Sequence, residues 1–201
     1  MVTYFRGVNL RLCATVVDMS LLTKEDARIL LHQYVSDEYQ RFHAEMVAAA
    51  MVEYARKFGE DEWLWWFTGY MHDIDYDMHP TEHPGPSLSW FKEWGYSEEL
   101  IHAVEAHADG FNGFTTKPET KLAKTLIACD EICGIFYAYQ KLNPIPFSEM
   151  KVSSIRKRLK ETKFAPGIDR SHIYNGCEHL GVELDDHIET LIKALAVLEQ
   201  K

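Results

Sequence analysis

Residues 21–200 are divided by helix-capping residues and helix breakers into segments that each carry the apolar spacing of an α-helix. The side chains suited to capping are Thr23 with Asp26, Ser36 or Asp37, Asp61, Ser97, Ser153 or Ser154, Asp169 and Asp185. No segment of this part alternates convincingly as a β-strand. The sequence therefore predicts an all-α fold, built as a single globular helical bundle.

Prolines and glycines locate the connections between the predicted helices. Pro80, Pro84 and Pro86 predict an irregular connection, and residues 109–114 predict a glycine-rich loop. Pro118 suits the first turn of a long helix, which we expect to end before Asn143. Helices separated by such short connections are typical of a compact bundle.

The length of 201 residues suits one domain, and 46% of the residues are hydrophobic, which is enough for a sizeable core. Residues 1–18 lack clear helical periodicity. We expect them to form an N-terminal extension, with residues 19–201 forming the helical domain.

Charge and composition exclude several classes of protein. The net charge of −10 argues against an extended nucleic-acid surface. No apolar run is long enough to span a membrane, and no signal peptide is evident, so we expect a cytoplasmic protein. The four cysteines, Cys13, Cys129, Cys133 and Cys177, lack the paired spacing of a zinc site and fit small apolar residues in a reducing compartment.

Several histidines and aspartates fall in one central region of the chain. His72 and Asp73 are adjacent at the end of an aromatic helix, and His43 lies on an inward-facing apolar stripe of the helix before it. Asp130 lies among apolar residues in mid-helix, where a buried carboxylate is costly unless it is paired or binds a metal. Imidazole and carboxylate are both good ligands for divalent metals, so this region predicts a metal site.

The order of these residues, with His83 and His107 between Asp73 and Asp130, resembles the HD-domain superfamily of metal-dependent phosphohydrolases. The phrase from His72 to Tyr76 and parts of the C-terminal region are similar to a subgroup of small predicted HD hydrolases. The resemblance implies that one metal is held by four residues, and that Asp73 bridges to a second metal. The implied ligands are His43, His72, Asp73 and Asp130 for the first ion, and Asp73, His83 and His107 for the second.

Three neighbouring positions leave alternatives open. Single-metal nucleotidases of this superfamily tend to carry Glu three residues after the His-Asp pair, whereas this chain has Tyr76, which favours two metals. Lys124 resembles a basic position before the final Asp and is a candidate phosphate-binding residue, or else part of a solvated helix face. Asp75 and Asp77 are either acceptors for imidazole N–H groups or solvated loop residues.

We therefore expect a metal-dependent phosphohydrolase that acts on a small phosphate ester, with nucleotides among the candidates. Asp73, Asp130 and Lys124 are the predicted catalytic residues, and the cofactor is one or two divalent ions of Fe, Mn, Zn, Ni, Co or Mg. The alternatives are an HD-domain diiron oxygenase and a non-catalytic module stabilised by metal. The expected partner is a small phosphorylated substrate, and a homo-oligomer is compatible with the sequence.

Overall fold

The computed structural model describes residues 4–5, 8–9 and 22–200. Its elements confirm the all-α prediction for residues 22–200, where every described element is a helix. The α-helices are α1 Lys24–Tyr34, α2 Glu38–Phe58, α3 Glu62–Met71, α4 Gly85–Glu93, α5 Glu98–His107, α6 Lys121–Leu142, α7 Val152–Lys160, α8 Arg170–Leu180 and α9 Leu184–Leu195. Two 3-10 helices follow α6 and α9, η2 Phe147–Glu149 and η3 Ala196–Gln200.

The N-terminal segment contributes one small antiparallel pair, β1 Tyr4–Phe5 with β2 Val8–Asn9. This pair lies within residues 1–18, outside the part of the chain for which helices were predicted. The division of the chain at residue 18 stays a prediction, and Cys13 lies outside the described residues. None of the described helices is long and apolar enough to cross a membrane.

Five of the predicted caps are present. The Thr23 hydroxyl accepts a hydrogen bond from the Asp26 backbone, while the Asp26 carboxylate accepts one from the Thr23 N–H at 2.9 Å. The remaining four caps are Asp37 on α2, Asp61 on α3, Ser97 on α5 and Asp169 on α8. These side chains satisfy N–H groups that have no partner inside the helix, which is why each helix begins there.

Three predicted helix starts are wrong by a few residues. Thr120 caps α6, so Pro118 precedes the helix instead of lying in its first turn. Lys151 and Glu183 occupy the cap positions of α7 and α9 without a side-chain hydrogen bond. The residues expected to cap these two helices, Ser153 or Ser154 and Asp185, lie inside the helices. An acidic residue such as Asp185 is favoured in the first turn as well as at the cap, so the pattern alone does not separate the two positions.

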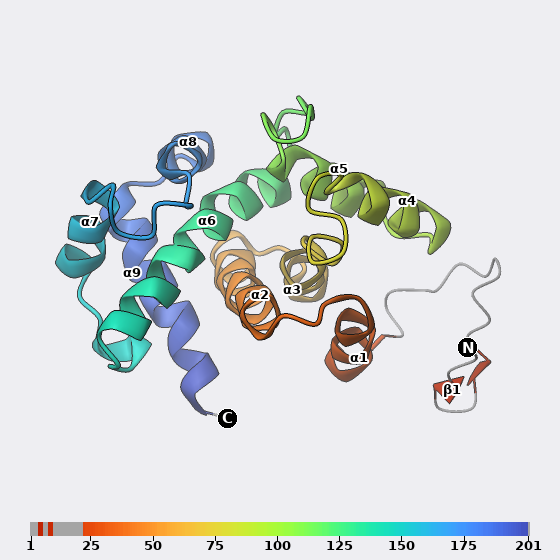
Figure 1. Ribbon diagram of the computed structural model, residues 1–201, viewed down its shortest axis with the longest axis horizontal. Helices are drawn as coiled ribbons and strands as arrows, with labels where there is room; N and C mark the ends of the chain where they lie inside the picture. Colours follow the sequence, from red (N-terminus) through yellow and green to blue (C-terminus); the bar gives the residue numbers. More distant parts are fainter. Residues whose placement is uncertain (1–3, 6–7, 10–21, 201) are drawn as a thin grey trace.

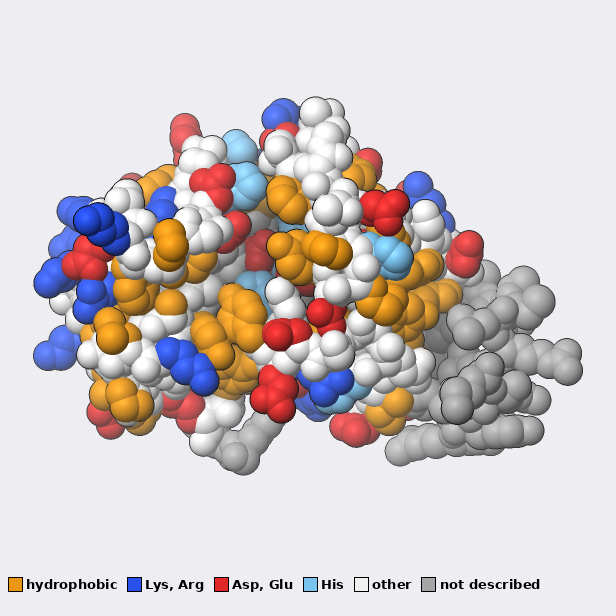
Figure 2. Space-filling model, in the orientation of Figure 1, with side chains coloured by type: hydrophobic (Ala, Val, Ile, Leu, Met, Phe, Trp, Pro, Cys, Tyr) orange, Lys and Arg blue, Asp and Glu red, His pale blue; other side chains and the backbone are white. Residues whose placement is uncertain are grey.

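Helices α2 and α6 lie at the centre of the molecule. Figure 1 shows α6 running between α7, α8 and α9 on one side and α2, α3 and α5 on the other. One cluster of buried side chains joins α2 and α6 to the C-terminal helices, and a second joins α2 to α1, α3, α4 and α5. Near the middle of the face shown in Figure 2, histidine and acidic side chains are visible inside a hollow.

A glycine sets the spacing of α2 and α3. A Cβ added at Gly69 would lie 3.1 Å from backbone atoms of Ala48 and 2.8 Å from a Met51 side-chain atom. The absence of a side chain therefore lets the two helices approach closely. This approach brings the end of α3, and His72 with it, against the face of α2 that carries His43.

Candidate metal centre

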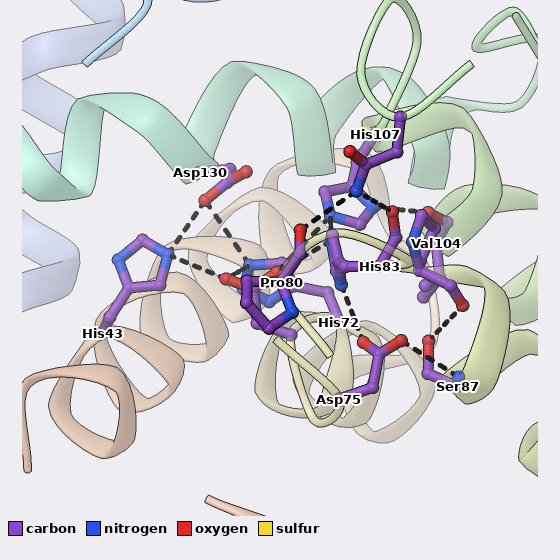
Figure 3. Close-up of polar contacts among 12 residues, drawn as sticks. His43, His72, Asp75, Pro80, His83, Ser87, Val104, His107 and Asp130 are labelled. Atoms are coloured by element: carbon purple, nitrogen blue, oxygen red, sulfur yellow. Dashed lines mark hydrogen bonds and ion pairs between the residues drawn. The ribbon is translucent and has the colours of Figure 1, made fainter. Parts of the chain in front are cut away.

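Six histidine and aspartate side chains converge from three helices and from the connection between α3 and α4 (Figure 3). They are His43 in the middle of α2, His72 and Asp73 directly after α3, His83 in the loop before α4, His107 at the end of α5 and Asp130 in the middle of α6. These are the six metal ligands that the sequence resemblance implied. The structure brings all six together, and their binding of metal remains a prediction.

One group of four contains His43, His72, Asp73 and Asp130, and its candidate ligand atoms all lie within 4.8 Å of one another. His43 Nε2 lies 2.9 Å from Asp130 Oδ1 and 4.0 Å from Asp73 Oδ2. His72 Nε2 lies 3.3 Å from Asp73 Oδ2 and 3.4 Å from Asp130 Oδ1. Two imidazoles and two carboxylates therefore point at one small volume.

A second group contains Asp73, His83 and His107, again within 4.8 Å. Asp73 Oδ1 lies 3.3 Å from His83 Nε2 and 3.5 Å from His107 Nε2. Asp73 belongs to both groups, because its Oδ2 faces the first and its Oδ1 faces the second. A carboxylate placed in this way can bridge two ions.

The hydrogen bonds of the outer ring nitrogens fix the direction of three imidazoles. His72 Nδ1 donates to the Gly69 carbonyl at 2.7 Å, and His107 Nδ1 donates to the Val104 carbonyl. His83 Nδ1 donates to Asp75 Oδ1 at 2.7 Å. With the proton on Nδ1, each Nε2 carries a lone pair and points into the site, as a metal-binding imidazole requires.

These lone pairs provide a test of whether a metal fits. His83 Nε2 and His107 Nε2 face each other at 3.1 Å, a contact between two lone pairs that is repulsive unless a cation or a proton lies between them. His72 Nε2 is buried, has no hydrogen-bond partner among the described residues, and faces two carboxylates. The donor set and its directions therefore fit divalent cations on both sides of Asp73.

Burial differs between the histidines and the carboxylates. The His72 side chain is fully buried, whereas the side chains of Asp73 and Asp130 each keep 19% exposure. The site therefore opens to solvent on the side of its acidic groups. A closed structural metal site would bury all of its ligands, so this opening favours a centre that admits water or substrate.

Charge interactions dominate the titration of the site. Burial alone would raise the pKa of Asp73, but the His72 ring and hydrogen bonds from His107 and His72 hold it well below the usual value. Burial alone would lower the pKa of His72, but Asp73 and Asp130 raise it well above the usual value. In the metal-free protein, this raised pKa places a second proton on the His72 ring, at Nε2, between the two ionised carboxylates. A divalent cation bound at this point would take the place of that proton.

The two aspartates left open by the sequence have different positions. Asp75 is fully buried, accepts from His83, and also accepts from the Ser87 N–H at 3.1 Å. Asp77 lies away from the site and accepts from Ser36 N and Oγ, both at 2.7 Å, just before α2 begins. Asp75 therefore orients a candidate ligand, whereas Asp77 ties the loop to the start of α2.

Tyr76 occupies the position where single-metal nucleotidases tend to carry Glu. Its ring stands edge-on to the His83 ring, with centroids 5.2 Å apart. Phe111 lies on the neighbouring loop, with its ring centroid 6.3 Å from that of His83. The Asn112 amide holds this loop in place by donating to the carbonyl oxygens of Pro80 and His83. Tyr76 therefore packs against His83 of the second group. It stands at the sequence position where single-metal nucleotidases tend to carry a water-positioning Glu.

The basic residues Lys124, Arg156 and Arg158 lie outside these contacts. Lys124 is half-buried on α6, and no described hydrogen bond or ion pair connects it to the six residues, so its role stays a prediction. On α7, Arg156 pairs with Asp185 on α9 at 2.8 Å, and Arg158 pairs with Glu161. These pairs engage Arg156 and Arg158 with acidic residues of the C-terminal region, away from the six clustered residues.

Fold and site together define an all-α protein with a histidine–aspartate cluster suited to divalent metals. Comparison with protein families gives a match to the HD domain over residues 42–134. The matched segment runs from α2 into α6 and contains all six clustered residues, so this match supports membership of the HD-domain superfamily. The searches of curated proteins and of solved structures found no match.

Proposed function

We propose that this protein is a metal-dependent phosphohydrolase that acts on a small phosphate ester. The HD domain suggests a metal-dependent hydrolase, and the cluster of histidine and aspartate supplies candidate ligands. We propose in addition that the group attacked is a phosphate and that the cofactor consists of two ions.

One observation supports this proposal above the others, namely the position of Asp73 between two groups of ligands. Its Oδ2 lies 3.3 Å from His72 Nε2, and its Oδ1 lies 3.3 Å from His83 Nε2. A carboxylate in this position would hold two ions close enough to act on one substrate, as in two-metal phosphatases and nucleases. A structural site needs no second group around the same carboxylate.

A divalent ion held there supplies Lewis acidity, because it lowers the pKa of a water ligand toward about 7 and offsets the negative charge of phosphoryl oxygens. Asp73 and Asp130 are ionised acceptors and can orient a water molecule by accepting its hydrogen atoms. Their partial exposure leaves room for the phosphate on the solvent side. The buried histidines hold the opposite side of the site rigid.

The test begins with protein purified without oxygen and analysed for bound metal. A panel of phosphate esters is then assayed for phosphate release with each divalent ion, and oxygen consumption is measured for iron-loaded protein. We expect metal-dependent phosphate release that disappears with a chelator and with Asp73→Asn. Oxygen consumption without phosphate release would identify an oxygenase, and bound metal with neither activity would identify a non-catalytic module.

A further inference from the structure

Tyr76 follows Asp73 by one turn of the connection between α3 and α4. Its N–H donates to the Asp73 carbonyl at 3.0 Å, so the backbone sets its position relative to that carboxylate. Its ring stands at 79° to the His83 ring, with the two centroids 5.2 Å apart. The Tyr76 side chain is partly exposed, whereas His83 is buried. Tyr76 therefore lies beside the second group of candidate ligands and remains accessible to solvent.

The hydroxyl of this side chain lies near acidic groups and has no partner. Burial raises its pKa, and the charges of Asp73, Glu131 and Asp130 raise it further, so the hydroxyl is near carboxylates of both the α3–α4 connection and α6. A tyrosine ordinarily has a pKa of about 10, so this one keeps its proton at neutral pH. Among the described residues the hydroxyl makes no hydrogen bond. Its proton is therefore free to be donated to a bound molecule.

The site has many hydrogen-bond acceptors but few donors. Ionised Asp73 and Asp130 only accept. The imidazoles of His72, His83 and His107 already donate their Nδ1 protons to protein oxygens. In the part of the chain that the structure describes, no lysine or arginine forms an ion pair with either aspartate. A neutral hydroxyl therefore supplies a donor that the carboxylates cannot provide.

A phosphoryl group is well matched to such a donor. Its oxygens carry negative charge and accept hydrogen bonds that are stronger than those between neutral groups. A glutamate at position 76 would only accept, so it could orient water but would repel a phosphoryl oxygen. The tyrosine hydroxyl donates to that oxygen without adding a negative charge to the site.

We propose that Tyr76 is a catalytic residue whose hydroxyl donates a hydrogen bond to a phosphoryl oxygen of the substrate. This inference rests on the proposed function and deepens it, because it assigns the contact that holds the phosphoryl group beside Asp73. The turn to Asp73 and the edge contact with His83 fix the ring before the substrate binds, as an efficient donor requires. Tyr76 keeps its proton throughout, so it orients the phosphoryl group and transfers no proton.

Tyr76→Phe tests this inference, because it removes the hydroxyl and keeps the ring against His83. We expect the affinity of the full-length, metal-loaded protein for inorganic phosphate to fall roughly tenfold to a hundredfold, as for a lost hydrogen bond to a charged group. For an ester that the parent hydrolyses, kcat/KM should fall at least about tenfold. Metal content and circular dichroism should equal those of the parent.

Tyr39→Phe is the matched control, because Tyr39 is a second tyrosine beside the cluster. Its ring centroid lies 5.9 Å from that of His43, and its pKa is raised by burial and by the charge of Asp130. Its hydroxyl oxygen, however, lies 3.3 Å from the position of a Cβ added at Gly134, and is thus directed against α6 one turn beyond Asp130. Phosphate affinity and kcat/KM should both equal those of the parent.

Several results would overturn the inference. Phosphate affinity of Tyr76→Phe equal to that of the parent is one, and a parent that binds no phosphate is another. Loss of metal from Tyr76→Phe would show that the hydroxyl acts through the ligands. Equal weakening in Tyr39→Phe would show a general effect of hydroxyls near the site. If Tyr76→Phe fails to fold, a crystal structure of the metal-loaded parent with inorganic phosphate decides, since a phosphate oxygen beyond hydrogen-bond distance of Tyr76 Oη overturns the inference.

Failure of this inference and failure of the proposed function give different results. A protein whose phosphate binding depends on the Tyr76 hydroxyl, but which hydrolyses no ester, would contradict the proposed function and support the phosphate contact. A protein that hydrolyses an ester equally well as the parent and as Tyr76→Phe would contradict the role of Tyr76 alone.

Discussion

Asp130 lies in a helix whose neighbouring residues Ala128, Cys129, Ile132 and Cys133 are all buried. A carboxylate in such surroundings is costly unless a cation compensates its charge. In this structure, His43 lies 2.9 Å from Asp130 and His72 lies 3.4 Å from it. The cost of burial is therefore offset only at the point where the six candidate ligands meet.

We therefore expect Asp130→Ala to lose the ion of the first group while remaining helical. The variant removes one of four ligands and one of two negative charges, so its affinity for metal should fall at least about tenfold to a hundredfold, the range for lost metal-orienting interactions. Metal analysis and circular dichroism of the same preparation measure both outcomes. Metal content equal to that of the parent would contradict the assignment of Asp130 as a ligand.

His83 offers a separate test of the second ion. His83→Ala removes a nitrogen that faces Asp73 Oδ1 and His107, but it leaves the first group intact. We expect the variant to bind about one ion fewer per chain and to lose most of its hydrolytic activity, because one activating charge is missing. Metal titration followed by phosphate release measures both quantities.

His79→Ala is the matched control for this experiment. His79 lies in the same loop, and its side chain pairs with Glu82 at 3.3 Å. Its carbonyl accepts a backbone hydrogen bond from His83 at 2.8 Å, which His79→Ala retains. It should keep both ions and full activity. A parent protein that binds one ion at saturation, together with an active His83→Ala variant, would exclude the two-metal mechanism.

His187 is a buried histidine outside the metal centre. Its Nε2 donates to the Ala128 carbonyl at 2.8 Å, and its Nδ1 accepts from the Tyr54 hydroxyl at 2.6 Å, so the ring is neutral. Burial lowers its pKa from 6.5 to about 4. The folded state therefore binds a proton less readily than the unfolded state, and the stability due to this difference is lost as the pH falls from 6.5 to about 4.

We expect this loss to reach about 3 kcal/mol in the free energy of unfolding, given 1.36 kcal/mol per pKa unit. His187→Gln removes the titration, so the difference in stability between parent and variant should shrink as the pH is lowered from 7 to 4. Denaturant unfolding of the metal-free proteins measures this difference. A constant difference across the pH range would show that His187 does not titrate in this way.

The residues of the metal centre were predictable from sequence to different degrees. His72, Asp73 and Asp130 stand out because charged or polar side chains end or interrupt apolar helices. The role of Asp75 was not predictable, because it depends on a hydrogen bond to His83 across a loop whose path the sequence does not determine. The 3.1 Å contact of His83 with His107 likewise exists only after α5 has packed.

At the scale of helices, α8 approaches α6 at a point without side chains between the backbones. A Cβ added at Gly176 would lie 2.6 Å from the Ala128 Cα and 2.8 Å from its nitrogen. Because these are backbone atoms, no side chain can rotate away to make room. Gly176 therefore fixes the position of α8 on the helix that carries Asp130.

We expect Gly176→Ala to destabilise the protein by about 1–3 kcal/mol, the usual cost of overpacking a core. The control is Gly167→Ala, at a glycine where an added Cβ meets nothing within 4 Å. Its effect should be close to zero. Denaturant unfolding compares the two variants, and equal stabilities would contradict the close packing of α6 and α8.

The start of a helix was predictable where a side chain of a type that favours the cap position also accepts a hydrogen bond from the first N–H groups of the helix. Thr23 and Asp61 are such residues, and both cap their helices as expected. The starts of α7 and α9 were misplaced because Lys151 and Glu183 cap them without a side-chain hydrogen bond. The residues that indicated a helix start there are polar residues of the first turn. The local sequence does not distinguish such residues from residues at the cap position.

At the scale of the whole molecule, the sequence predicted the all-α class but not the arrangement of the helices. The meeting of Tyr39 and Tyr137 depends on the pairing of α2 with α6, which are far apart in the chain. Each helix alone shows only an apolar face and some exposed aromatic residues. A groove between two helices becomes visible only when both have been placed.

The metal centre joins the ends and middles of α2, α3, α5 and α6 with the loop before α4, so metal binding should stabilise the whole fold. An ion that binds only the folded state, at a free concentration of 100 times its dissociation constant, contributes about 2.7 kcal/mol. For a protein of 201 residues this corresponds to a rise in the melting temperature of roughly 5–11 °C. Thermal unfolding with and without a chelator measures the rise, which we expect to be much smaller for Asp130→Ala. An equal melting temperature of the parent with and without metal would show that the six residues do not bind an ion in the folded state.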